Sequence, residues 1–355
     1  MSGGISQLVA TGAQDVHLVG DPQVSFFRSN YKRHTNFSAV RARQVIQGGN
    51  TDAAAGGMST VRFEKKGDLL SYTYLTKQNG TDSISLNTDI KYVELYIGGQ
   101  MVDTQYMDYS STQWKNCEAN SYAKGAEVLN NLVYPLHFFF CDNWTNALPL
   151  VALQYHDVEI RIYWDDSIAT GTFECWSDFI YLDEAERTYF AETTQNMLIK
   201  QTQRHLTQSG KVQNFNFNHP VLYIGCPSAA NNQLESGNDT KAELQFNING
   251  VQSGEAMRIS PHWRQVPGYY HSPDCGDNGI SQPFCIPFAL NLCSNQPSGS
   301  LNFSRLDSSR LEIVTSGMSF EKDETDTGGD SKSYYAVNWN VLKIENGMGG
   351  LMYSN

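Results

Sequence analysis

Histidine is the residue type in this chain best suited to hold a metal ion, and a metal site needs several ligands that converge on one point. The eight histidines contain no His-x-His pair of the kind that a cupin enzyme places near a glutamate. We therefore expect each one to be a structural residue, and we assign no catalytic, cofactor-binding or metal-binding residue to the chain. The histidines are His17, His34, His137, His156, His205, His219, His262 and His271.

Two other clusters could carry chemistry. The acidic stretch Glu321, Asp323, Glu324, Asp326 and Asp330 could hold calcium, but it lacks the EF-hand spacing, and a solvated hairpin loop is the favoured interpretation.

The second cluster is aromatic: His262-Trp263-Arg264 and Tyr269-Tyr270-His271 could line a sugar-binding groove by ring stacking. Packing at a contact between domains or subunits is favoured over that groove. The chain also lacks the GxxxxGK[ST], GxGxxG, HExxH and GxSxG motifs. We therefore predict that the protein is not an enzyme.

Composition favours an oligomeric β-protein. Of 355 residues only 17% are charged, whereas 12% are aromatic, and a surface of this kind favours burial against other subunits. A net charge of −12 argues against a general nucleic-acid binder, so we predict no direct specific contact with nucleic acid. The seven cysteines form no CxxC pair, which predicts free and mostly buried thiols in a reducing compartment.

Alternation of apolar and polar residues with period two dominates the chain, as is typical of half-buried strands. It predicts strands over 158–164 and 335–343, and hairpins that turn at Gly98-Gly99 and Asn249-Gly250. A short helix is expected over 183–192.

Similar pieces recur in the same order at an offset of roughly 140–150 residues, which predicts two copies of one β-domain. Each copy would hold about eight short strands, the size of a jelly-roll sandwich, and the two would meet near 190–212. The matching pieces are 91–99 with 241–250, Leu148-Pro149-Leu150 with Ile286-Pro287-Phe288, and Val158-Glu159-Ile160 with Leu311-Glu312-Ile313.

The first 37 residues are apolar and rich in turns, yet too short and too polar to span a membrane. They also lack the basic start and apolar centre of a signal peptide, so we interpret them as an arm that docks onto another molecule. From Pro22 to Thr51 there is no acidic residue, whereas Arg28, Lys32, Arg33, Arg41 and Arg43 are basic. These bases either pair with acids elsewhere in the fold or neighbouring subunit, or face an anionic membrane or partner.

Several collinear blocks, which together run through nearly the whole chain, resemble the major capsid proteins of nucleocytoplasmic large DNA viruses. The blocks are 4–15, Gly20 to Phe27, Tyr31 to Phe37, Ala147 to His156, Phe217 to Pro220, Pro297 to Arg305 and Asn346 to Leu351.

This resemblance implies an all-β fold of two tandem eight-stranded antiparallel jelly rolls, a double jelly roll, with short helices in loops. We divide the chain into an N-terminal arm (1–24), a first jelly roll (25–195) and a second jelly roll with the C-terminal strand and tail (196–355). The family geometry implies homotrimeric capsomers of pseudo-hexagonal outline that tile an icosahedral shell and contact neighbouring capsomers. We expect the arm to lie on the inner side, against minor capsid proteins and the internal membrane, in a virion capsid assembled in the host cytoplasm.

The chain is shorter than typical members of that family, which predicts trimmed loops and a low-profile capsomer. Two other functions stay open: a minor capsid paralogue used at special shell positions, and a glycan-binding host-attachment protein on the same tandem sandwich. A sandwich enzyme is disfavoured by the missing metal ligands and nucleophile.

Overall fold

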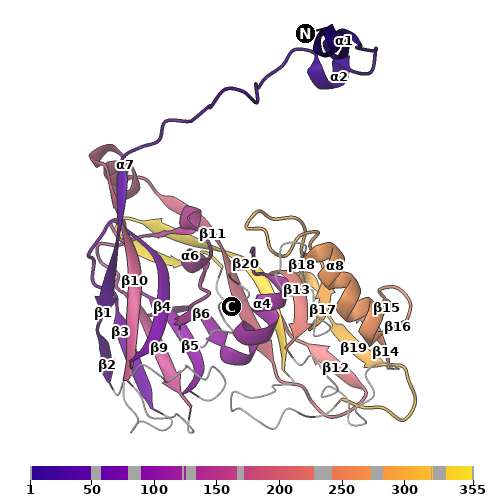
Figure 1. The fold of residues 1–355 in the computed structure, drawn as a ribbon. Coiled ribbons are helices and arrows are strands. Elements are labelled where there is room, and N and C mark those ends of the chain that lie inside the picture. Colours follow the sequence, from indigo (N-terminus) through magenta and orange to yellow (C-terminus); the bar gives the residue numbers. More distant parts are fainter. Residues whose placement is uncertain are drawn as a thin grey trace. The chain divides into compact units, whose positions relative to one another are not determined.

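The computed structural model describes residues 2–48, 57–78, 89–121, 124, 133–165, 172–227, 242–272, 283–320, 322 and 333–353. By its internal contacts the chain divides into two units, Met1–Asn36 and Phe37–Asn355. The second unit holds four antiparallel sheets that form two β-sandwiches (Figure 1).

The first sandwich has two five-stranded sheets. In sheet A the order is β1 (Phe37–Gln44), β10 (Thr172–Leu182), β4 (Leu69–Gln78) and β7 (Val133–Pro135), and β8 (Leu148–Pro149) also pairs with β4. In sheet B the order is β2 (Ile46–Gly48), β3 (Met58–Arg62), β9 (Val158–Trp164), β5 (Ile90–Ile97) and β6 (Gln100–Tyr106).

The second sandwich repeats this plan. In sheet C the order is β11 (Gln195–His205), β20 (Tyr334–Glu345), β13 (Pro220–Cys226) and β17 (Phe284–Pro287); β18 (Leu301–Asn302) pairs with β13 and β21 (Met348–Leu351) with β20. In sheet D the order is β12 (Val212–Phe215), β19 (Ser309–Ile313), β14 (Glu243–Ile248) and β15 (Val251–Gln252), with β16 (Met257–Arg258) on β14.

Helices are short and lie in the connections and the arm. The predicted helix over 183–192 is confirmed as α7 (Glu184–Glu192), which begins where the Asp183 side chain accepts a hydrogen bond from the Glu184 N–H at 2.9 Å. Within the described residues, no helix combines the length and the apolar character that a membrane crossing would require. The other helices are α1 (Ser2–Val9), α2 (Val16–Val19), η1 (Tyr109–Trp114), α4 (Lys115–Cys117), α6 (Phe139–Asp142), η2 (Trp144–Asn146), η3 (Ile259–Gln265), α8 (Val266–His271) and η4 (Phe303–Arg305).

Both predicted hairpins form, and their turns use the backbone conformations that the residue types allow. Gly98 and Gly99 join β5 to β6 with φ of 59° and 82°, and Asn249 and Gly250 join β14 to β15 with φ of 50° and 78°. Two consecutive positive φ values are the mark of a type I′ turn, whose twist suits a two-residue hairpin.

The internal repeat is confirmed by strand pairing. Strand β5 pairs with β9 as β14 pairs with β19, so that Leu95 lies opposite Ile160 and Phe246 opposite Leu311. Sheet A (β1-β10-β4-β7) likewise corresponds strand for strand to sheet C (β11-β20-β13-β17). The pieces 91–99 and 241–250, and likewise 158–160 and 311–313, therefore occupy the same places in two copies of one sandwich. The third predicted match is wrong: Leu148-Pro149 forms β8, whereas Ile286-Pro287 ends β17, whose counterpart is β7.

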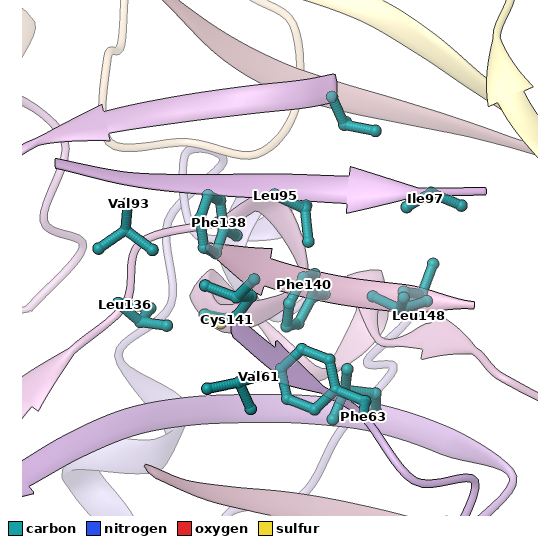
Figure 2. Close-up of a cluster of buried hydrophobic side chains, with 14 of the residues drawn as sticks. Val61, Phe63, Val93, Leu95, Ile97, Leu136, Phe138, Phe140, Cys141 and Leu148 are labelled. Carbon is teal, nitrogen blue, oxygen red and sulfur yellow. The ribbon is translucent and has the colours of Figure 1, made fainter. Parts of the chain in front are cut away.

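Each sandwich has its own apolar core. Figure 2 shows the first, where side chains of β3 and β5 gather around Phe138 and Phe140, both fully buried. The second core is rich in aromatic rings, with Phe215, Phe284 and Tyr334 among its buried members.

Strand β20 contributes to both cores. Tyr334 and Ala336, near its start, pack in the second core, whereas Leu342 and Ile344, near its end, pack in the first. Ile199 of the neighbouring strand β11 also enters the first core. Strand ends from the region 196–355 thus complete the first sandwich, and the domain boundaries at 24 and 195 stay predictions.

We expect Leu342→Ala to destabilise the chain by about 2–5 kcal/mol, because it empties a fully buried site in the first core. Urea unfolding followed by tryptophan fluorescence measures this change. Val251→Ala, at a side chain that is 70% exposed, is the matched control and should shift stability by less than about 0.5 kcal/mol. Unchanged stability of the Leu342 variant would show that the end of β20 does not support the first core.

Candidate functional site: the junction between the two sandwiches

A segment of the first sandwich covers the outer face of a sheet in the second. After β6 the chain forms η1 and α4, which lie between the two sandwiches (Figure 1). Their buried apolar side chains pack in one cluster with residues of sheet C and of the loop that follows β17. This junction cluster comprises Tyr109, Trp114, Cys117, Ala119, Leu222, Tyr223, Cys285, Ala289, Leu292, Cys293, Tyr335, Val337 and Trp339.

The start of η1 is fixed by a bond to the second sandwich. The Asp108 carboxylate caps the helix by accepting from the Tyr109 N–H at 2.9 Å. The same carboxylate accepts from the Tyr335 hydroxyl of β20, at 2.9 Å and 2.8 Å to its two oxygens. One buried acid therefore sets both the helix terminus and its position over sheet C.

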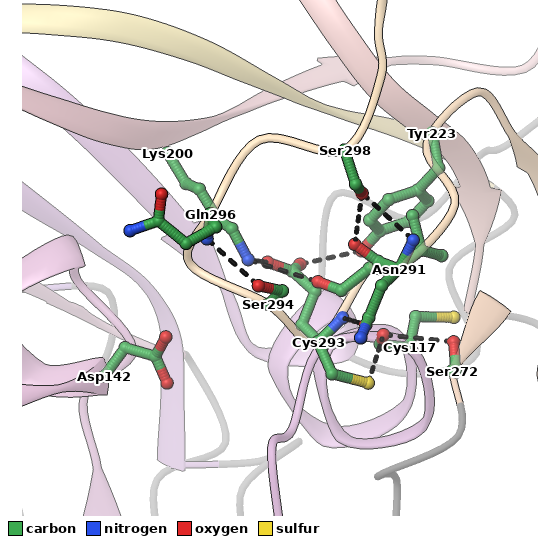
Figure 3. Close-up of polar contacts among 12 residues, drawn as sticks. Cys117, Asp142, Lys200, Tyr223, Ser272, Asn291, Cys293, Ser294, Gln296 and Ser298 are labelled. Atoms are coloured by element: carbon green, nitrogen blue, oxygen red, sulfur yellow. Dashed lines mark hydrogen bonds and ion pairs between the residues drawn. The ribbon is translucent and has the colours of Figure 1, made fainter. Parts of the chain in front are cut away.

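Glu118, just after α4, is the second buried acid of the junction, and its neighbourhood is drawn in Figure 3. Its carboxylate accepts hydrogen bonds from the Tyr109 hydroxyl and, at 2.8 Å, from the Tyr223 hydroxyl of β13. Lys200 of β11 lies 3.4 Å from the carboxylate and also donates to the Leu292 carbonyl at 3.2 Å. Burial, followed by the charge of Glu118, raises the pKa of both phenols well above the ordinary value, so both act as neutral donors.

Asp103 is the third buried acid, on β6, where β6 runs beside β11. Its carboxylate accepts from the Thr202 N–H at 2.9 Å, and the neighbouring Gln201 amide donates to the Val102 carbonyl. Burial raises the pKa of Asp103 to about 7, although hydrogen bonds to the carboxylate oppose the shift. The edge of sheet B is thus joined to sheet C by side-chain hydrogen bonds.

Close backbone approach at glycines completes the junction. A Cβ at Gly225 of β13 would lie 1.7 Å from the Gln113 amide nitrogen of η1, so only glycine admits this side chain. A Cβ at Gly349 would lie 2.8 Å from Leu153, and one at Gly347 would lie 2.6 Å from the Tyr155 ring. Gly225 interrupts an apolar strand, which is a sequence signal of close approach.

Four of the seven blocks that carry the family resemblance contact one another in two pairs. The block 147–156 contacts the block 346–351, where the Tyr155 N–H donates to the Gly347 carbonyl at 3.0 Å. Within the second sandwich, the His219 N–H donates to the Ser304 hydroxyl at 2.8 Å, joining the block 217–220 to the block 297–305. These segments are distant in sequence but hold one another in place.

The junction positions the two sandwiches and leaves little room for a substrate. Its cavity, lined by Asp103, Glu118 and Lys200 among others, measures about 30 Å³, on the scale of a single water molecule. Within the described ranges, no three His, Cys, Asp or Glu residues are placed to hold a metal ion. The buried acids accept hydrogen bonds from both sandwiches, so their observed role is to fix orientation.

The histidines lie at separate places. His137 stacks on Trp114 with ring centroids 3.6 Å apart, and burial, together with the charge of Lys124, lowers its pKa to about 3. His156 contacts the Gly349 backbone through Nδ1 at 2.9 Å, and His271 contacts the Ala289 carbonyl through Nδ1 at 2.8 Å. His17 and His34 lie in the arm, His205 packs edge-on against Phe215, His219 is buried beside Ser304, and His262 is exposed on η3.

The acidic stretch and the aromatic cluster were the other two candidate sites in the sequence. The acidic stretch from Glu321 to Asp330 lies outside the described residues, apart from Lys322 within it. In the aromatic cluster, Trp263 is buried in the second core and its indole N–H donates to the Met257 carbonyl at 3.2 Å, so it cannot stack on a sugar. Tyr269 and Tyr270 are exposed on α8.

Six of the seven cysteines are described, and all six are free and buried, as predicted. Burial raises the pKa of Cys141 and of Cys175 to about 12, which leaves both thiols protonated and unreactive at neutral pH.

The basic residues between Pro22 and Thr51 fall into two groups with different surroundings. Arg41 and Arg43 of β1 pair with acids of β10, at 2.7 Å to Asp178 and 3.0 Å to Glu174, as the first interpretation of the basic run expected. Arg28, Lys32 and Arg33 lie in the N-terminal unit Met1–Asn36, where all three are exposed. This unit also exposes large apolar side chains: Ile5, Leu8, Val9, Val16, Leu18, Val19, Val24, Phe26, Phe27 and Tyr31.

Two tandem jelly rolls, joined by a buried junction and preceded by an arm, define a double jelly-roll protein. Family models confirm this class: residues 25–185 match the major capsid protein N-terminus, and residues 186–350 match the large eukaryotic DNA virus major capsid protein. The chain belongs to the family of major capsid proteins of large eukaryotic DNA viruses, which are structural virion proteins and not enzymes.

Relatives match along their whole length. The chain is 32% identical to the major capsid protein of Pyramimonas orientalis virus and 31% identical to that of Paramecium bursaria Chlorella virus 1, each over 100% of both chains. Among solved structures it is similar to PBCV-1 VP54, with a TM-score of 0.75 at 23% identity over 93% of this chain and 100% of that one. The double jelly-roll fold predicted from the sequence is thereby confirmed.

We expect Gly225→Ala to loosen the junction, since the added Cβ would displace the Gln113 side chain at a cost of about 1–3 kcal/mol. Thermal unfolding of the variant measures the loss. Gln113→Ala in the Gly225→Ala background removes the clashing group and should recover part of the stability. If the double variant is no more stable than Gly225→Ala alone, the clash with Gln113 is not the cause of the loss.

The raised pKa of Asp103 predicts that the free energy of unfolding falls as pH rises. Because its pKa is raised from 3.8 to about 7 in the folded chain, the folded state binds the proton more tightly between these values. Stability contributed by this group is therefore lost from about pH 4 to pH 7, and the ionised, buried carboxylate is unfavourable above pH 7.

We expect Asp103→Asn, which keeps an oxygen for the Thr202 N–H, to raise stability at pH 8 and to change it little below about pH 4. Urea unfolding across this pH range measures the effect, and Asp307→Asn, at an exposed site, is the control. An equal change at both pH values would contradict the assignment to Asp103.

Proposed function

We propose that this major capsid protein forms homotrimeric capsomers of pseudo-hexagonal outline that tile the faces of an icosahedral shell. The observation that carries this proposal is the duplication, because two corresponding sandwiches per chain give six similar units in a closed ring of three chains. The junction supports it, since Asp108 and Glu118 hold the two sandwiches in one orientation. The low profile of the capsomer stays a prediction.

The arm supplies the contact beneath the shell in this proposal. Phe26 and Phe27, which follow residues 1–24, are 95% and 98% exposed, and residues Met1–Asn36 together form a unit of their own. An apolar surface of this kind is stabilised by docking onto another molecule. We propose minor capsid proteins and the internal membrane as its partners, with the basic residues Arg28, Lys32 and Arg33 facing anionic groups, and assembly in the host cytoplasm.

Size-exclusion chromatography with light scattering tests the capsomer directly. The proposal expects a particle of three times the chain mass of 39.7 kDa. A stable monomer with its arm intact would contradict it, and saturable sugar binding by that monomer would favour the host-attachment alternative. Trimers found only at special shell positions by electron microscopy would favour a minor capsid paralogue.

We expect deletion of residues 2–24 to leave a folded trimer but to abolish ordered shell assembly. The physical reason is that the arm unit ends before β1, so no strand of either sandwich is removed. Light scattering reports the trimer, and electron microscopy of the assembly reaction reports the shell. If the truncated chain fails to trimerise, the arm is part of the capsomer core.

A further inference from the structure

We propose that α8 of one copy docks onto the outer face of sheet A in a second copy, as η1 and α4 dock onto sheet C within the chain. The inference rests on the proposed trimer, for which it names the two contacting surfaces. It follows from comparing the two halves of the duplicated fold, which differ in what covers each sheet.

The docking segment is itself part of the duplication. In the first sandwich a π-helix and an α-helix, η1 and α4, follow β6; in the second, η3 and α8 follow β16 in the same order. Gln113-Trp114-Lys115 resembles His262-Trp263-Arg264, 149 residues later (263 − 114), the same offset as the strands. Each tryptophan also contacts an aromatic ring at a corresponding place. Trp114 contacts His137, just after β7 of sheet A, and Trp263 contacts Phe284 in β17, the counterpart of β7 in sheet C.

Corresponding sheets differ in burial. Strand β20 is buried on both faces from Tyr334 to Asn340, and β13 is buried from Val221 to Cys226, because η1 and α4 cover the outer face of sheet C. The corresponding strands are buried on alternate residues over part of their length, from Cys175 to Ile180 in β10 and from Ser71 to Thr76 in β4. Among the residues that the structure describes, sheet A therefore lacks the cover that its counterpart has.

The open face of sheet A presents aromatic rings where a cover would lie, next to the Arg41–Asp178 ion pair. Tyr74 and Trp176 lie opposite each other there, both half-buried, and Tyr74 also lies opposite Pro135. A hollow of about 340 Å³ opens on this face. Its lining includes Tyr72, Tyr74, Val133, Pro135, Leu136 and Trp114.

The corresponding helix in the second sandwich is exposed. On α8, Tyr269 is 76% and Tyr270 is 68% exposed, and Val266 is 41% exposed. Figure 1 shows α8 on the second sandwich, beside β17 and β18. Tyrosine is typical of interface anchors, since its ring buries a large area at low entropic cost.

The pairing of these two surfaces defines the assembly. The helix lies on the second sandwich and the hollow on the first, so the contact is head-to-tail and repeats from chain to chain. Within a chain, α4 already contacts α8, and the Ser272 hydroxyl at the end of α8 donates to the Cys117 carbonyl at 3.1 Å. The same helix-on-sheet contact between chains makes all six contacts of the ring alike, and the ring closes at three copies.

Photo-cross-linking tests the contact in the full-length protein. We expect benzoylphenylalanine at position 270 to link between chains to the tryptic peptide 67–77, which contains Tyr72 and Tyr74. The same probe at position 189, an exposed tyrosine of α7, is the matched control and should give no link to that peptide. Links from position 270 only to the arm or to a second sandwich would overturn the inference.

Complementary variants test the head-to-tail arrangement. Tyr269→Ser with Tyr270→Ser should weaken the trimer by more than about tenfold in dissociation constant, and Val133→Asp in the hollow should do the same. Tyr189→Ser should leave it unchanged. Mixing the helix variant with the hollow variant should give dimers, because one intact contact remains per pair, but no closed trimer. Full trimers from the mixture, or from either variant alone, would overturn the inference.

These outcomes separate the two proposals. If the wild-type protein is trimeric and the probe at position 270 links elsewhere, the surfaces assigned here are wrong while the capsomer stands. If the wild-type protein is monomeric, the proposed capsomer itself is wrong.

Discussion

The pairing of β20 with β11 is the constraint on which the rest of the structure depends. Eleven residue pairs join the two strands without interruption, from Gln195 opposite Ile344 to His205 opposite Tyr334. One end of this ladder closes the first core, through Ile199, Leu342 and Ile344, and the other end closes the second through Tyr334 and Ala336. Because a paired ladder of this length does not bend freely, the two sandwiches share one backbone support.

The buried polar groups of the junction fix the orientation of the two sandwiches relative to each other. Asp103, Asp108 and Glu118 are buried acids of the first sandwich, and each bonds to a group of the second. Buried charges of this kind are costly to desolvate, so their contribution to stability is small even when they are well paired. Their hydrogen bonds, however, are directional and are satisfied in one arrangement. In the capsomer that we propose, whose three chains present six similar edges, a fixed angle between sandwiches matters more than added stability.

Much of the fold could be predicted from residue patterns. Period-two alternation located β5, β9, β14 and β20, two dipeptides located the hairpin turns, and the repeat located the second sandwich. The junction was not predictable in this way. The segment 335–340 alternates like a half-buried strand, yet both of its faces are buried, because a helix from another part of the chain covers it. Glu118 and Asp103 gave no local signal, since their partners Tyr223 and Thr202 lie about a hundred residues away. Gly225, a glycine inside an apolar strand, carries a residue-type signal of close approach, but that signal does not identify Gln113 as the partner.

Native-state hydrogen exchange, measured by mass spectrometry at increasing urea, tests most directly whether the two sandwiches form one cooperative unit. The account predicts that amides of β9 in the first sandwich, β14 in the second and β20 between them share one free energy of opening. Opening of β14 at a clearly different free energy from β9, with β20 following only one of them, would show that each sandwich unfolds on its own and would contradict the account.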